Sequence, residues 1–123
     1  MGFQPIIALN ANDQLLVRNE EVAIADLRER VKVFIMNPQG LPHLAAAPNQ
    51  AIVSLVNDRA TSYAAYLAVY NELKAAYQEL WDEAAQARYG TWFDQLTPAQ
   101  QQNIRARIPL VISEAEPTDY ETY

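Results

Sequence analysis

The chain contains no cysteine and little glycine, and both shortages exclude chemistry. Without a thiolate there can be no cysteine nucleophile, no disulfide and no cysteine-based zinc site. The three glycines stand at positions 2, 40 and 90, too far apart for a glycine-rich loop around a phosphate. No run of about 18 apolar residues is present, and no charged and apolar signal peptide opens the chain. We therefore expect no membrane span within these residues.

Basic residues are also scarce, since 9 lysines and arginines face 15 acidic residues, for a net charge of -6. Nucleic-acid binding depends on clustered cations that neutralise phosphates, and no such cluster occurs here. The balance therefore argues against a nucleic-acid partner. A length of 123 residues with 50% hydrophobic residues is typical of one globular domain.

Histidine occurs once, as His43, in a proline-rich loop without a nearby cysteine or acid. A zinc site usually needs more histidine or cysteine, so a solvated loop residue is the better interpretation. No nucleophile-elbow motif surrounds Ser54, Ser62 or Ser113. Adjacent acids such as Glu20-Glu21 point in different directions and do not form an acid and base pair. The sequence therefore predicts no catalytic, metal or cofactor site, and a protein that is not an enzyme.

The spacing of apolar residues predicts the element order ββαβααβ. The expected elements are strands at 5–9 and 14–17 joined by the turn NAND, a helix at 24–36, a loop at 37–49, a strand at 51–56, a helix from 62 to Gly90, a helix from Thr97-Pro98 to about 107, and a strand LVIS at 110–113. We expect an α+β two-layer sandwich, a small mixed sheet with helices on one face. The single domain spans 3–113, and the acidic tail 114–123 is expected to be flexible. The strands 14–17 and 51–56 are expected to be parallel neighbours.

The stretch AIVSLVNDRATSY (51–63) has two interpretations. An acid and an arginine, Asp58 and Arg59, follow a buried strand, where open sheets tend to bind ligands. A polar pocket there would make the chain a small ligand-binding or enzymatic domain. The simpler interpretation is a turn, in which Asp58 bonds the local backbone, Thr61 or Ser62 caps the next helix, and Tyr63 begins that helix's packed face.

Tyrosines recur at helical spacing in the long helix and lead to a tryptophan. The members of this stripe are Tyr63, Tyr66, Tyr70, Tyr77 and Trp81. Most such stripes pack against a sheet with their polar edges at the rim. The alternative is that part of the stripe stays exposed as a contact surface, where tyrosine and tryptophan are favoured.

Three segments together resemble the periplasmic domain of the ExbD/TolR family. IIALNANDQLLVRNEEVAIADLRERV (6–31) is similar to the family's strand, turn, strand and first helix. AIVSLVNDRATSYAAYLAVYNELKAA (51–76) is similar to its third strand, acid-containing turn and second helix, and LVISEAEP (110–117) to its closing strand and tail. The chain departs from the family at Ala23, where a hydroxyl cap is usual, and in the added helical length at 80–109.

The resemblance implies the periplasmic domain of a single-pass inner-membrane subunit that couples the proton-motive force to transport across the outer membrane. It implies a homodimer, an ExbB-like motor subunit reached through a membrane segment outside this sequence, and a TonB-like protein or peptidoglycan as partner. A short terminal strand offers unpaired backbone groups to another chain. We therefore expect Leu110, Val111, Ile112 and Ser113 to make the partner or dimer contact, with Asp58 and Tyr63 shaping the neighbouring loop.

Overall fold

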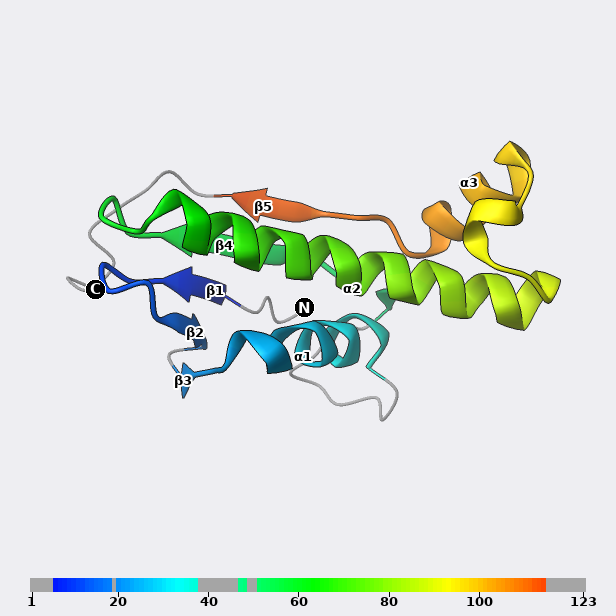
Figure 1. The fold of residues 1–123 in the computed structure, drawn as a ribbon. Coiled ribbons are helices and arrows are strands. Elements are labelled where there is room, and N and C mark those ends of the chain that lie inside the picture. The colour runs from blue at the N-terminus through cyan, green and yellow to red at the C-terminus, as the bar shows by residue number, and fades with distance from the viewer. Residues whose placement is uncertain (1–5, 19, 38–46, 49–50, 115–123) are drawn as a thin grey trace.

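The structure is a computed structural model that describes residues 6–18, 20–37, 47–48 and 51–114. It is an α+β fold with one mixed sheet and a layer of helices (Figure 1). In chain order the elements are β1 (Ile6–Leu9), β2 (Leu15–Val17), β3 (Glu20–Glu21), α1 (Ile24–Met36), β4 (Val53–Asn57), α2 (Tyr63–Tyr89), the 3-10 helix η2 (Phe93–Gln95), α3 (Pro98–Arg107) and β5 (Ile112–Glu114). The predicted order ββαβααβ is confirmed, with β3 and η2 as short additions. His43 and most of the loop 37–49 lie outside the described residues.

The strand order in the sheet is β3-β2-β1-β4-β5. The predicted hairpin is present, with Ile7 opposite Val17 in the antiparallel β1–β2 pair. The parallel neighbour of β4 is β1, with Ile7 opposite Leu55, so the expected pairing of 14–17 with 51–56 is wrong. The reason lies in β3, which pairs with the outer edge of β2 and leaves β1 as the open neighbour.

Helices α1 and α2 lie side by side over one face of the sheet (Figure 1). Strand residues alternate between the two faces. In β4, for example, Val53 and Leu55 are buried, whereas Ser54 and Val56 are half-buried. The main core joins these strand residues to the helices and contains Ile7, Leu9, Leu27, Val31, Ile35, Val53, Leu55, Val69, Leu73 and Tyr77.

The long helix α2 has clear signals at both ends. Ser62 is its N-cap, because the Ser62 Oγ accepts a hydrogen bond from the Ala65 amide at 3.1 Å. This settles the choice between Thr61 and Ser62. At the other end Gly90 adopts φ 71°, a left-handed conformation that glycine enters without steric cost. The chain therefore leaves the helix at Gly90 and turns back toward it.

The returning chain forms a second, smaller core beyond the sheet (Figure 1). Its buried members are Ala85, Phe93, Leu96 and Ile104, from α2, η2 and α3. Helix α3 begins as predicted, with Thr97 as its N-cap and Pro98 at the first helical position. The Thr97 Oγ1 accepts a hydrogen bond from the Gln100 amide, and the Gln100 side chain accepts one from the Thr97 amide. This lobe packs on the end of α2 and not on the sheet.

The closing strand β5 runs parallel to β4, with Val53 opposite Ile112. It covers Ile112–Glu114, whereas the sequence predicted 110–113. Leu110 precedes the strand, and Glu114, which was assigned to the tail, is its last residue. The rest of the tail, 115–123, lies outside the described residues.

Candidate protein-contact edge

The two edges of the sheet differ in how they meet solvent. At one edge, β3 has two residues, the exposed acids Glu20 and Glu21. Glu20 also forms an ion pair with Arg30 of α1, at 3.1 Å between Nη2 and Oε1. Short strands and charged side chains both discourage the addition of a further strand. The β3 edge is therefore protected.

At the other edge, two apolar side chains lie just before β5. Leu110 and Val111 are 38% and 37% exposed. The Val53 amide donates to the Val111 carbonyl at 3.1 Å, so the Val111 carbonyl points toward β4. Because successive backbone groups of a strand alternate in direction, the amide and carbonyl of Ile112 and those of Glu114 point to the open side. These are the groups that an added strand would bind.

Of the four residues predicted for partner contact, the structure places three on the surface. Leu110, Val111 and Ser113 are exposed. Ile112 is half-buried and packs against the main core. Its side chain holds β5 onto the domain, while its outward backbone groups remain at the edge.

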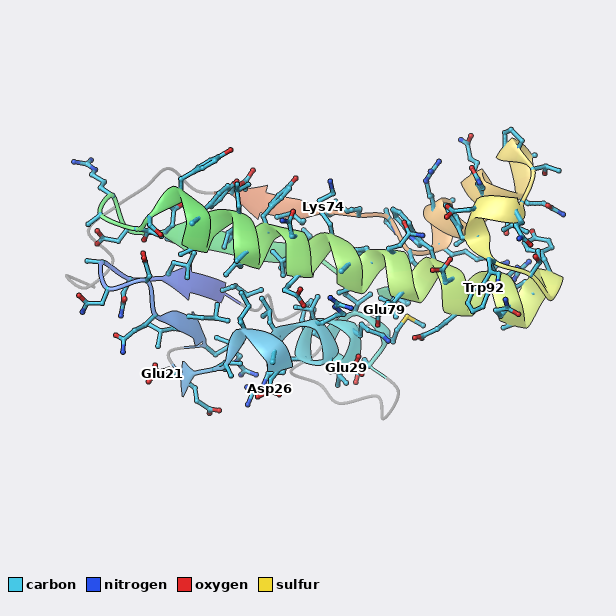
Figure 2. The ribbon with its side chains drawn as sticks, viewed as in Figure 1. Glu21, Asp26, Glu29, Lys74, Glu79 and Trp92 are labelled. Carbon is cyan, nitrogen blue, oxygen red and sulfur yellow. The ribbon has the colours of Figure 1, made fainter. Side chains whose placement is uncertain are left out.

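A ladder of stacked tyrosines lies on α2 beside this edge. The ring centroids of Tyr63 and Tyr66 are 6.3 Å apart, and those of Tyr66 and Tyr70 are 6.0 Å apart. The Lys74 ammonium lies 5.8 Å from the Tyr70 ring centroid and extends the ladder. Figure 2 shows Lys74 on the side of α2 nearer to β5. Both interpretations of the stripe hold in part, because Tyr77 is fully buried in the core and Tyr63 is 74% exposed.

Tyr66 connects the ladder to the strand. Its hydroxyl donates a hydrogen bond to the Glu114 carboxylate. This bond to Glu114, helped by partial burial, raises the pKa of Tyr66 to about 12. Glu114 was not predicted as a site residue, because its sequence context assigned it to the tail. Helical spacing predicted on which face of the helix Tyr66 lies, but it did not predict that the Tyr66 hydroxyl bonds Glu114.

The loop at Asp58 is a self-bonded turn. Asp58 is 6% exposed, and its Oδ1 accepts a hydrogen bond from the Ala60 amide at 2.8 Å. The Thr61 hydroxyl donates to the backbone carbonyls of Leu9 and Asn10, which ties the turn to β1. Asp58 therefore shapes the loop from within. Tyr63 does not begin a packed face, since its ring is the most exposed of the ladder and contacts Tyr66.

Asp13, at the turn between β1 and β2, also orders this loop. Its Oδ1 accepts a hydrogen bond from the Ser62 amide at 2.8 Å, and hydrogen bonding to Ser62 lowers the pKa of Asp13. A carboxylate at this position also stabilises the positive N-terminal end of α2. The hairpin turn and the helix N-terminus are thereby joined, a link between residues 49 positions apart.

Charged side chains join α1 to α2 on the side away from β5. Arg28 contacts Glu72 at 3.1 Å and Glu79 at 2.5 Å, and Lys32 contacts Glu79 at 3.1 Å and Glu83 at 2.6 Å. The hydrogen bonds raise the pKa values of Arg28 and Lys32 and lower the pKa of Glu79. Beside this network lies an open groove of about 630 Å³ lined by Ile24, Ala25, Arg28, Glu29, Ala68, Asn71, Glu72 and Glu79. Asp58 and Arg59 are not part of it.

Within residues 6–18, 20–37, 47–48 and 51–114, no group of three or more histidine, aspartate or glutamate side chains is placed to hold a metal ion. In the same ranges, none of the helices combines the length and the apolarity needed to cross a membrane.

The fold and the site together define an α+β domain with one protected sheet edge and one open edge beside an aromatic ladder. Such an arrangement is suited to contact with another polypeptide. No family model matches the chain, and no curated protein is significantly similar to it in sequence.

Proposed function

We propose that this chain is the periplasmic domain of an ExbD/TolR-like energy-transduction subunit, and that it acts by dimerisation and by binding a TonB-like partner or peptidoglycan. The order of elements agrees with the segments that resemble the family, 6–31, 51–76 and 110–117. In this proposal the membrane segment that reaches an ExbB-like motor subunit lies outside the sequence. The domain itself is not an enzyme.

The observation that carries the proposal is the difference between the two sheet edges. The edge strand β3 is short, acidic and paired to Arg30, whereas β5 presents outward backbone groups next to exposed Leu110 and Val111. An added strand gains backbone hydrogen bonds at β5, and its side chains above the sheet gain contact with Tyr66 and Tyr70. Strand addition at β5 therefore supplies both affinity and a preferred register.

The alternative, a ligand-binding or enzymatic domain with a pocket at Asp58 and Arg59, has less support. The buried Asp58 carboxylate bonds the Ala60 amide of its own turn. A group that binds a substrate must present its polar atoms to the ligand. The edge at β5 is the better candidate because its polar groups face outward.

The test is a matched pair of lysine substitutions. Val111→Lys places a charge at the open edge, a device that natural proteins use to block strand addition. Val33→Lys makes the same change at a residue of α1 that is 48% exposed, and in Figure 1 helix α2 lies between α1 and β5. Sedimentation equilibrium should show a dimer for the wild type and Val33→Lys, and at least about tenfold weaker association for Val111→Lys.

Hydrogen exchange provides the second measurement. The amides of Ile112 and Glu114 should exchange rapidly in dilute protein and slowly in the dimer, because only an added strand protects them. A wild-type protein that stays monomeric at high concentration, or a dimer that Val33→Lys weakens as much as Val111→Lys does, would contradict strand addition. Expression of the full gene would then test the membrane segment directly, since a span of about 20 apolar residues before position 3 is expected.

A further inference from the structure

A second groove lies on the lobe beyond the sheet, next to an exposed tryptophan. It has a volume of about 660 Å³ and is lined by Glu79, Asp82, Glu83, Gln86, Ala87 and Trp92. Trp92 is 57% exposed. Figure 2 places Trp92 near the end of α2, at the opposite end of the molecule from Glu21. The groove is therefore separate from the β5 edge.

The backbone holds Trp92 in place. After Gly90 the chain reverses, and the Phe93 amide donates to the Asp82 Oδ1 at 3.2 Å. The next side chain, Phe93, enters the small core, where its ring centroid lies 5.3 Å from that of Trp81. Trp92 itself is the N-cap of η2, and its exposed side chain forms one wall of the groove.

The charge around the groove favours a cation. Three of its lining residues are acidic and none is basic. Arg28 and Lys32 of α1 both pair with Glu79, and Lys32 also pairs with Glu83, yet the Glu83 side chain remains 61% exposed. The groove thus offers an aromatic face and a carboxylate to the same ligand.

One arginine of the same lobe already packs on aromatic rings. The Arg105 guanidinium lies 5.6 Å from the ring centroid of Trp81 and 5.2 Å from that of Phe93. A planar guanidinium stacks on an aromatic face and can bond a carboxylate with its edge. In the described part of the chain, no cation or ring packs on the indole of Trp92. The indole of Trp92 therefore offers a guanidinium the kind of face on which Arg105 packs, and Glu83 adds a carboxylate.

We propose that this groove binds an arginine-bearing segment of a partner protein, with one guanidinium stacked on Trp92 and bonded to Glu83. Apart from Glu79, the lining residues lie in 80–109, the added helical length for which the family resemblance gives no role. It does not depend on the β5 edge or on the family assignment. Lysine binds more weakly than arginine here, because a compact ammonium cannot stack and bond in one plane.

The test titrates acetylated and amidated hexa-arginine into the full chain, with hexa-lysine and hexa-glutamate in parallel. The readout is the NMR shift of the Trp92 indole N–H, assigned by its loss in Trp92→Phe. Hexa-arginine should shift this signal, hexa-lysine should bind about three- to fivefold more weakly, and hexa-glutamate should not bind. The indole N–H of Trp81, which donates to the Ile108 carbonyl at 2.8 Å, reports that the lobe stays folded.

A matched set of variants separates the site from general charge attraction. Trp92→Ala and Glu83→Gln should each weaken hexa-arginine binding about fivefold. Glu21→Gln removes the same charge at the far end of the molecule and should change binding less than about 1.5-fold. The proposal would be overturned if Glu21→Gln and Glu83→Gln weakened hexa-arginine binding equally. It would also be overturned if Trp92→Ala, with an unshifted Trp81 signal, bound hexa-arginine as tightly as the wild type.

Discussion

The Tyr66 hydroxyl hydrogen-bonds the Glu114 carboxylate and so fastens the last residue of β5 to the first turns of α2. Few other contacts hold this strand. It pairs with β4 over three residues, and of its side chains only Ile112 packs on the main core. The bond therefore affects how often β5 separates from β4, and with it the state of the edge at which we propose strand addition.

Tyr66→Phe should loosen β5 without unfolding the domain. The phenyl ring keeps the stacking with Tyr63 and Tyr70, so only the bond to Glu114 is lost. A partly exposed bond to a carboxylate contributes about 0.5–1 kcal/mol, which corresponds to a roughly two- to fivefold faster exchange of the Ser113 amide, which faces β4. Tyr63→Phe is the control, because no hydrogen bond of the Tyr63 hydroxyl is seen in the described residues. Equal exchange in both variants would show that the bond does not hold the strand.

Alkaline pH should weaken the same contact in the wild type. The folded-state pKa of Tyr66, about 12, lies above the ordinary value of 10.0. A raised tyrosine pKa means that the bond contributes fully below pH 10 and that its contribution is lost as the pH rises through 12. Ultraviolet titration should therefore show one tyrosine ionising near pH 12 that disappears in Tyr66→Phe. If the two proteins titrate alike at high pH, the bond is absent in solution.

Glu79→Gln should destabilise the contact between α1 and α2. Glu79 accepts hydrogen bonds from Arg28 and Lys32, and the bond from Arg28 is the main reason that its pKa is lowered. Since the group is partly exposed, we expect a loss of up to about 1 kcal/mol in the free energy of unfolding at pH 7. The loss should be smaller in acid. With a lowered pKa, the wild-type contribution is complete above the ordinary value of 4.5 and disappears as the pH falls through the folded-state pKa.

The control for this substitution is Glu21→Gln, an equal change of charge on the protected edge. Urea denaturation of the wild type and both variants at pH 7 and pH 3 should show a difference for Glu79→Gln that is largest at pH 7. A constant difference at both pH values would assign the effect to packing and not to the charge of Glu79.

Asp58→Asn should alter the stability of the loop and little else. The amide oxygen of the substituted side chain can still accept a hydrogen bond from the Ala60 amide, but without the charge. We expect a loss of about 0.5–1.5 kcal/mol in chemical denaturation and an unchanged dimerisation constant. Tight binding of a small polar molecule by the wild type that Asp58→Asn abolishes would instead support a pocket at this loop.

How far the sequence predicted this structure depends on the range of each interaction. Local signals predicted the cap at Thr97 and the end of α2 at Gly90, and they limited the cap of α2 to Thr61 or Ser62, because each of these signals acts within a few residues. The neighbour of β4 in the sheet was predicted wrongly, because it depends on the presence of β3. Strand β3 consists of two glutamates, and glutamate is not a residue that indicates a strand.

Of the candidate site, only the edge strand could be predicted from the sequence. The apolar run 110–113 indicated an edge, but the bond between Tyr66 and Glu114 joins residues 48 positions apart. Helical spacing places Tyr66, Tyr70 and Tyr77 on related faces and does not show which one the sheet covers. The answer depends on how α2 lies between α1 and β5. In the structure Tyr77 is buried, and Tyr66 and Tyr70 lie at the margin.

Tyr77→Phe should leave the protein equally stable or stabilise it by up to about 1 kcal/mol. The Tyr77 side chain is fully buried, and its hydroxyl has no hydrogen-bond partner among the described residues. Burial raises the pKa of Tyr77, and the nearby backbone amide of Val111 offsets only part of this rise. Phenylalanine removes the unsatisfied oxygen and keeps the ring, which packs near Trp81 with the centroids 6.4 Å apart.

Tyr77→Ala, by contrast, should lose about 3–5 kcal/mol because it leaves a cavity in the main core. Urea denaturation of the three proteins distinguishes the cases, and a loss above about 1 kcal/mol in Tyr77→Phe would mean that the hydroxyl is bonded, with the Val111 amide beside β5 as the nearest donor.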